Sequence, residues 1–80
     1  MPYWVYILEC SDGTFYTGIT NDLDKRITVH NRGKASKYTR IRLPVKLRYK
    51  EEVENRSEAL KREWAIKKLS KHDKVSLFID

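Results

Sequence analysis

The chain has 80 residues, of which 40% are hydrophobic and 35% are charged, a composition typical of a globular protein. A chain of this length makes one domain with a small core, so we expect a single domain over residues 1–80. Its one cysteine, Cys10, excludes an intrachain disulfide, and no apolar run approaches the roughly 20 residues that span a bilayer. Because the N-terminus also lacks a signal-peptide pattern, we expect a cytoplasmic protein without a membrane partner.

The positive charge is unevenly distributed along the chain. The net charge is +6, and residues 25–50 contain ten lysines and arginines but no aspartate or glutamate. A field this one-sided attracts polyanions, which favours a nucleic-acid partner. A solvated basic face without a specific site is the other explanation that charge alone allows.

Two stretches rich in aromatic and β-branched residues, 4–10 and 14–20, predict a pair of strands joined by the turn signal at residues 11–13. A two-residue turn would place Tyr6 and Tyr16 on opposite faces of this hairpin. A three-residue loop with its glycine in the left-handed conformation would place both phenols on one face. The residues alone allow either turn, and ordinary strand packing also accounts for both tyrosines.

Helix caps and periodicity divide the rest of the chain into further elements. Asp22 and Asn55 are suited to cap the N-termini of helices, and Gly33 is suited to end the first helix. The expected elements after the hairpin are a helix over 22–32, a basic loop over 34–43, a strand over 45–50, a helix over 56–70 and a short helix or strand over 71–80. This ββαβα order with a short C-terminal element predicts an α+β fold.

The predicted helix over residues 56–70 carries a carboxylate on its inward side. At about 100° per residue its apolar positions are Leu60, Trp64, Ile66 and Ala59. Glu63 falls between these positions, so it faces the core rather than solvent. A buried carboxylate requires a cation, a hydrogen-bond donor or a metal, and an ion pair with a lysine or arginine explains it as well as a functional site does.

The predicted helix over residues 22–32 shows the same feature. Arg26 and His30 lie one turn apart beside the apolar positions of that helix. Arg26 can extend along the edge of the core to solvent, and a lone histidine is commonly a semi-buried core residue. Titratable groups beside the inward faces of two helices are nevertheless the pattern that a functional site produces.

Taken in order, these residues resemble the GIY-YIG nuclease domain, and the similarity extends from about Tyr3 to Phe78. The residues that match the family's pattern are Tyr6, Tyr16, Gly18, Arg26, His30 and Glu63, whereas Trp4 and Val5 replace the Gly and Ile of its first triplet and Thr17 replaces the Ile of its second. The resemblance implies a three-stranded antiparallel sheet flanked by helices, with both tyrosines on one side. It therefore favours the three-residue turn, in which Gly18 leaves open space beside Tyr6.

The resemblance also implies phosphodiester hydrolysis assisted by one divalent ion, Mg²⁺ or Mn²⁺. Glu63 is then the sole protein ligand of the metal, and Arg26 stabilises charge on the scissile phosphate. Tyr16 or Tyr6 orients or deprotonates the attacking water, and His30 matches the position of a polar helper. One carboxylate with waters and substrate oxygens suits Mg²⁺, which keeps much of its hydration.

The basic middle segment is expected to hold the sugar-phosphate backbone, with its tyrosine stacking on a base. These expected nucleic-acid-binding residues are Lys34, Lys37, Tyr38, Arg40 and Arg42. We therefore predict a metal-dependent endonuclease that acts on DNA with low sequence specificity and without a protein partner. The alternatives are a catalytically impaired nucleic-acid-binding module of the same fold, since no asparagine follows Glu63, and a small interaction domain.

Overall fold

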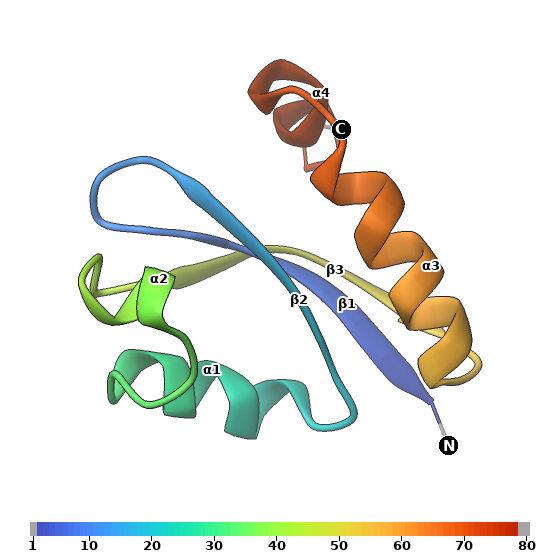
Figure 1. Cartoon of the computed structure of the whole chain (residues 1–80), viewed down its shortest axis with the longest axis horizontal. Coiled ribbons are helices and arrows are strands. Elements are labelled where there is room, and N and C mark those ends of the chain that lie inside the picture. Colours follow the sequence, from blue (N-terminus) through green and yellow to red (C-terminus); the bar gives the residue numbers. More distant parts are fainter. Residues whose placement is uncertain (1, 79–80) are drawn as a thin grey trace.

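The computed structural model of the protein describes residues 2–78. The strands are β1 (Tyr3–Glu9), β2 (Phe15–Thr20) and β3 (Lys46–Val53), and the helices are α1 (Leu23–Asn31), α2 (Lys37–Arg40), α3 (Arg56–Lys67) and α4 (Lys71–Ser76). The strands form one antiparallel sheet in the order β2-β1-β3, with helices on both of its faces (Figure 1). The predicted α+β fold is confirmed. No helix within residues 2–78 has the length and apolar character needed to cross a membrane.

The β1–β2 hairpin closes through a three-residue loop that ends at Gly13. The φ of this glycine is +83°, in the region that other residues rarely adopt. Leu8 lies opposite Tyr16, and Tyr6 lies opposite Gly18, so the two phenols project from the same face of the sheet. Of the two turns that the residues allowed, the structure therefore has the longer one.

Alternate residues of β1 contribute to two separate apolar clusters, one on each face of the sheet. Val5, Ile7, Ala59 and Ile66 form the buried centre of the cluster under α3 and α4, whereas Tyr6, Leu8, Cys10 and Val45 form that of the cluster under α1 and α2. Because β2 is an edge strand, its free edge lies between the two helical layers (Figure 1). Side chains from both layers can approach one another there.

Local capping explains the positions of α1 and α2. Asp22 accepts a hydrogen bond from the backbone N–H of Lys25 at 3.2 Å, and Gly33, with a φ of +75°, follows the end of α1. The segment predicted as a basic loop contains the four-residue helix α2, because Ser36 caps the backbone N–H of Thr39 at 3.1 Å. The expectation of a loop over all of 34–43 is therefore wrong.

The later elements have boundaries that differ from the expected ones. Strand β3 continues to Val53 because it pairs with β1 as far as Tyr3, beyond the predicted end at residue 50. Asn55 caps α3 as expected, but the helix ends at Lys67 and Ser70 caps a new helix, α4. The undetermined C-terminal element is thus a helix over its described part, and residues 79–80 lie outside the described residues.

The buried side of α3 differs from the expected one. The side chains of Trp64 and Leu60 are 63% and 40% exposed, whereas Ala59 and Ile66 are completely buried. Ala59 and Ile66 therefore form the buried contact of α3 with the sheet, and Trp64 lies outside it. Glu63 lies one turn from Ala59 on this inner side, and its side chain is only 19% exposed.

Candidate active site

A hydrogen-bonded chain connects β1, α1 and α2 in the interior. The hydroxyl oxygen of Tyr6 lies 2.9 Å from Nε2 of His30, and Nδ1 of the same ring lies 2.9 Å from Oγ1 of Thr39. The Thr39 hydroxyl oxygen also lies 3.1 Å from Oγ of Ser36 and 3.4 Å from the carbonyl oxygen of that residue. The His30 ring therefore connects the Tyr6 phenol to α2 through its two nitrogens. Thr39 was not predicted as a site residue, and its one sequence signal is the cap at Ser36.

Burial keeps the Tyr6–His30 pair uncharged at neutral pH. It lowers the pKa of His30 from 6.5 to about 4, and the positive charge of Arg26 acts in the same direction. Burial also raises the pKa of Tyr6, an effect that the nearby Arg26 guanidinium opposes. His30 is therefore neutral and Tyr6 protonated at neutral pH.

Arg26 is the cation nearest to this pair. Its Nε is buried and has no hydrogen-bond partner among the described residues. A buried donor without a partner costs free energy that an anionic ligand would recover. Arg26 also borders a surface hollow of about 200 Å³ where β2 meets α1, so its side chain joins the interior pair to the surface.

The second phenol, Tyr16, contacts the same histidine. The rings of Tyr16 and His30 meet edge to face, with centroids 5.2 Å apart. Beside them, a Cβ added to Gly18 would lie 2.5 Å from the Tyr6 hydroxyl oxygen. The space that Gly18 leaves is therefore filled by the Tyr6 phenol and is not open, which corrects that expectation. Glycine is required here because the phenol rests on the strand backbone.

Glu63 approaches this group from the opposite helical layer. Its negative charge acts on the Tyr6 phenol and raises the pKa of that group, as does the neighbouring Tyr16. The Oε2 atom of Glu63 lies 3.5 Å from Nζ of Lys67, one turn further along α3. The ion pair that the residues alone allowed is therefore present. We call Tyr6, Tyr16, Arg26, His30 and Glu63 the candidate active site.

The donor set at Glu63 fits a hard divalent cation held mainly by water. Within residues 2–78 no three side chains of histidine, cysteine, aspartate or glutamate gather in a metal-binding group. A metal at this site would therefore be bound by the one carboxylate, with waters and substrate oxygens completing its coordination. Mg²⁺ and Mn²⁺ accept such a ligand set, whereas a structural zinc ion does not.

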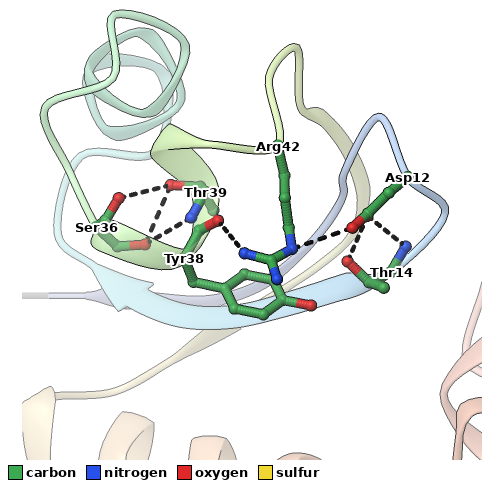
Figure 2. A network of polar contacts seen from close by, with 6 residues as sticks. All are labelled: Asp12, Thr14, Ser36, Tyr38, Thr39 and Arg42. Atoms are coloured by element: carbon green, nitrogen blue, oxygen red, sulfur yellow. Dashed lines mark hydrogen bonds and ion pairs between the residues drawn. The ribbon is translucent and has the colours of Figure 1, made fainter.

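The basic segment divides into two parts. Lys34, Lys37 and Arg40 are exposed and border a hollow of about 370 Å³ beside α2. Arg42 instead bonds within the molecule: its Nε donates to Asp12 at 3.0 Å, and its Nη1 donates to the carbonyl oxygen of Tyr38 at 2.9 Å (Figure 2). The first three residues are thus available to a ligand, and Arg42 is committed to the fold.

Arg42 also fixes the ring of Tyr38 against the candidate active site. The guanidinium carbon lies 3.8 Å from the centre of the Tyr38 ring, and Figure 2 shows it between that ring and Asp12. The Tyr38 ring is stacked near Tyr16, with centroids 6.2 Å apart and planes inclined by 25°. Of the five predicted nucleic-acid-binding residues, Tyr38 is thus the one stacked near a candidate active-site ring.

A hollow of about 250 Å³ at the free edge of β2 contains residues that the sequence did not single out. We call it the edge hollow, and its lining residues are Phe15, Tyr16, Thr17, Tyr38, Lys67 and Lys74. The spacing of Lys67 from Glu63 is a detectable signal, since residues four apart share one helix face. Lys74 carries no such signal, because its place depends on the turn between α3 and α4.

Two tyrosines on adjacent antiparallel strands, an arginine on the next helix and a glutamate on a later helix are the residues on which the resemblance to the GIY-YIG domain was based. The sequence profile of the GIY-YIG catalytic domain matches residues 2–76, and the chain belongs to this family. The resemblance inferred from the residues is confirmed. The family is generally one of endonucleases that act on nucleic acid.

Within the family the chain is similar to small proteins called UPF0213 proteins. One from Halobacterium salinarum is 53% identical over 92% of this chain and 96% of its own, and one from Staphylococcus saprophyticus is 49% identical over 94% and 92%. The solution structure of a UPF0213 protein from Bacillus halodurans is 45% identical, covers 96% of this chain and 82% of its own, and has a TM-score of 0.60. A second solution structure, of a protein from E. faecalis, is 42% identical with a TM-score of 0.63 over 96% and 83% of the two chains.

Proposed function

We propose that the protein is a metal-dependent endonuclease that hydrolyses phosphodiester bonds in DNA with low sequence specificity. The observation that carries this proposal is the hydrogen-bonded Tyr6–His30 pair, which contacts the Tyr16 ring and is subject to the charges of Arg26 and Glu63. Such a set provides a cation for the phosphate, a carboxylate for a metal and a group that handles the attacking water. The exposed cations beside α2 bind the DNA backbone, which carries no sequence information.

The charge that develops on the phosphate is stabilised by Arg26. Its guanidinium is permanently charged and has a buried Nε–H without a hydrogen-bond partner in residues 2–78. Glu63 would hold the Mg²⁺ or Mn²⁺ ion, which supplies Lewis-acid stabilisation of the same charge when bound. Lys67 then has to release the Glu63 carboxylate with which it is now paired.

The attacking water is oriented or deprotonated by Tyr6 or Tyr16. The hydrogen bond between the Tyr6 hydroxyl and Nε2 of His30 fixes the position of the phenol oxygen. The nearby Arg26 favours the phenolate of Tyr6, while burial opposes it. His30 acts as the polar helper that holds the Tyr6 oxygen in position through their hydrogen bond.

The test is cleavage of fluorescently labelled branched, nicked and single-stranded DNA with and without Mg²⁺. We expect wild-type protein to cut only with the metal, and Glu63→Ala to lose about 100-fold or more in rate, since removal of a metal ligand withdraws several kcal/mol of stabilisation. Glu58→Ala is the matched control, because Glu58 lies on the same helix and pairs with Lys61 in solvent. Equal cleavage by wild type and Glu63→Ala would refute the assigned site.

The ion pair between Glu63 and Lys67 favours a second candidate function. A lysine that neutralises the only predicted metal ligand is also what a nucleic-acid-binding module without nuclease activity would contain. That function predicts DNA binding that weakens steeply with salt, together with no cleavage in Mg²⁺ or Mn²⁺. The same cleavage experiment, run beside a binding titration, separates the two.

A further inference from the structure

The edge hollow is built from three parts of the chain. The floor comes from β2 through Phe15, Tyr16 and Thr17, one wall from Tyr38 of α2, and the other from Lys67 and Lys74 of α3 and α4. The Tyr38 wall is held in place, because Asp12 binds Arg42 and Arg42 binds both the carbonyl and the ring of Tyr38 (Figure 2). The Tyr38 side of the hollow is therefore fixed by the fold.

The chemistry of the edge hollow combines aromatic rings with positive charge. Lys67 and Lys74 supply two ammonium groups, and the Nζ of Lys71 lies 5.6 Å from the ring of Phe15. Lys74 forms no ion pair with any side chain in residues 2–78, and Lys67 pairs only with Glu63. A ligand that has both an anionic group and a flat ring satisfies both features, and a nucleotide is such a ligand.

The edge hollow and the candidate active site are connected through two residues. Tyr16 belongs to both, since its ring contacts His30 and also lines the hollow. Lys67 connects them a second time, because it lines the hollow and binds Glu63. A nucleic-acid strand whose phosphate lies between Arg26 and Glu63 would therefore place an adjoining nucleotide in the hollow.

We propose that the edge hollow binds one unpaired nucleotide next to the cleaved phosphate, with Lys74 on its phosphate and Tyr38 against its base or sugar. This inference rests on the proposed function, and it specifies the substrate as a strand that is single or unpaired beside the cut. A base can enter an aromatic hollow only when it is released from its own stack. Duplex DNA without a flap or gap leaves the hollow empty.

The experiment measures binding in EDTA, where no cleavage takes place, by fluorescence anisotropy of a labelled 12-nucleotide single strand and its blunt duplex. We expect Lys74→Ala to weaken single-strand binding about fivefold and to lower the salt slope by about 0.7, the value for one phosphate contact. Lys61→Ala removes the same charge from an exposed position on α3, where Lys61 forms a surface ion pair with Glu58. Its affinity for the single strand should stay within about twofold of wild type. Neither substitution should change duplex binding by more than about twofold.

A second variant tests the aromatic wall independently of charge. Tyr38→Leu should reduce single-strand affinity by at least about fivefold, the lower range for one stacked base, and should leave duplex affinity unchanged. Thermal denaturation followed by circular dichroism checks that each variant is folded before binding is measured. Loss of both affinities together would show that Tyr38 does not select unpaired bases and would overturn the proposal.

The outcomes separate this inference from the proposed function. Equal weakening by Lys74→Ala and Lys61→Ala would refute the nucleotide site even if the wild-type protein cleaves DNA. Selective weakening by Lys74→Ala would support the site even if no cleavage is seen with any metal, in which case the nuclease proposal alone fails. Absence of any binding to the single strand at low salt would refute both.

Discussion

Protonation of His30, a candidate active-site residue, makes the free energy of unfolding depend on pH. The imidazole is fully buried, and burial lowers its pKa from 6.5 to about 4. Between these two pH values the unfolded chain binds a proton that the folded chain does not, so stability falls as the pH decreases. The loss begins near pH 6.5 and reaches at most about 3 kcal/mol by pH 4, while above pH 7 this group has no further effect.

This pH dependence can be measured by urea denaturation at pH 7 and pH 5. We expect wild-type protein to lose about 2 kcal/mol more than His30→Gln between these conditions, because glutamine does not titrate. The variant also controls for the carboxylates, which contribute equally to both proteins. If the two proteins show the same change in unfolding free energy, His30 is not the group that takes up the proton.

At the scale of one element, the loss of stability on substitution in α3 should follow the burial of the side chain and not its size. Ile66 is fully buried under the sheet, so Ile66→Ala should cost about 2–4 kcal/mol of unfolding free energy. Trp64 is 63% exposed and its ring contacts Lys68, so Trp64→Ala should cost less than about 1 kcal/mol. Chemical denaturation of both variants measures the difference, and a larger loss for Trp64→Ala would contradict the observed orientation of the helix.

The sequence predicts those features of an element that depend on neighbouring residues. Asp22 and Asn55 place the starts of α1 and α3 because a cap acts on the backbone two or three residues away. The side on which α3 is buried is not local in this sense. Its apolar positions form a broad stripe, and packing against the distant strand β1 decides that Ala59 and Ile66 are the buried part of that stripe.

The candidate site shows the same division at the scale of the whole molecule. Periodicity correctly placed Glu63 on the inner side of its helix, and the family resemblance explains why both phenols share a face. The contact between His30 and Thr39 requires α2 to fold back on α1, and the position of Lys74 requires the turn after α3. A periodic pattern predicts neither of these chain reversals, so sequence reasoning missed Thr39 and Lys74.

The charge of the whole molecule leads to a prediction about salt. Lys34, Lys37 and Arg40 are three exposed cations around one hollow, and each phosphate they neutralise releases a counterion. The triple alanine variant should therefore reduce the slope of log affinity against log salt for a single strand by about two. The matched control replaces Arg56, Lys61 and Lys68, which are equally cationic and lie on or at the end of α3. An anisotropy titration between 50 and 200 mM salt measures both slopes. The two variants have the same net charge, so a difference between their slopes reports the position of the removed charges. Equal slopes would mean that DNA senses the net charge of +6 rather than a defined basic hollow beside the candidate active site.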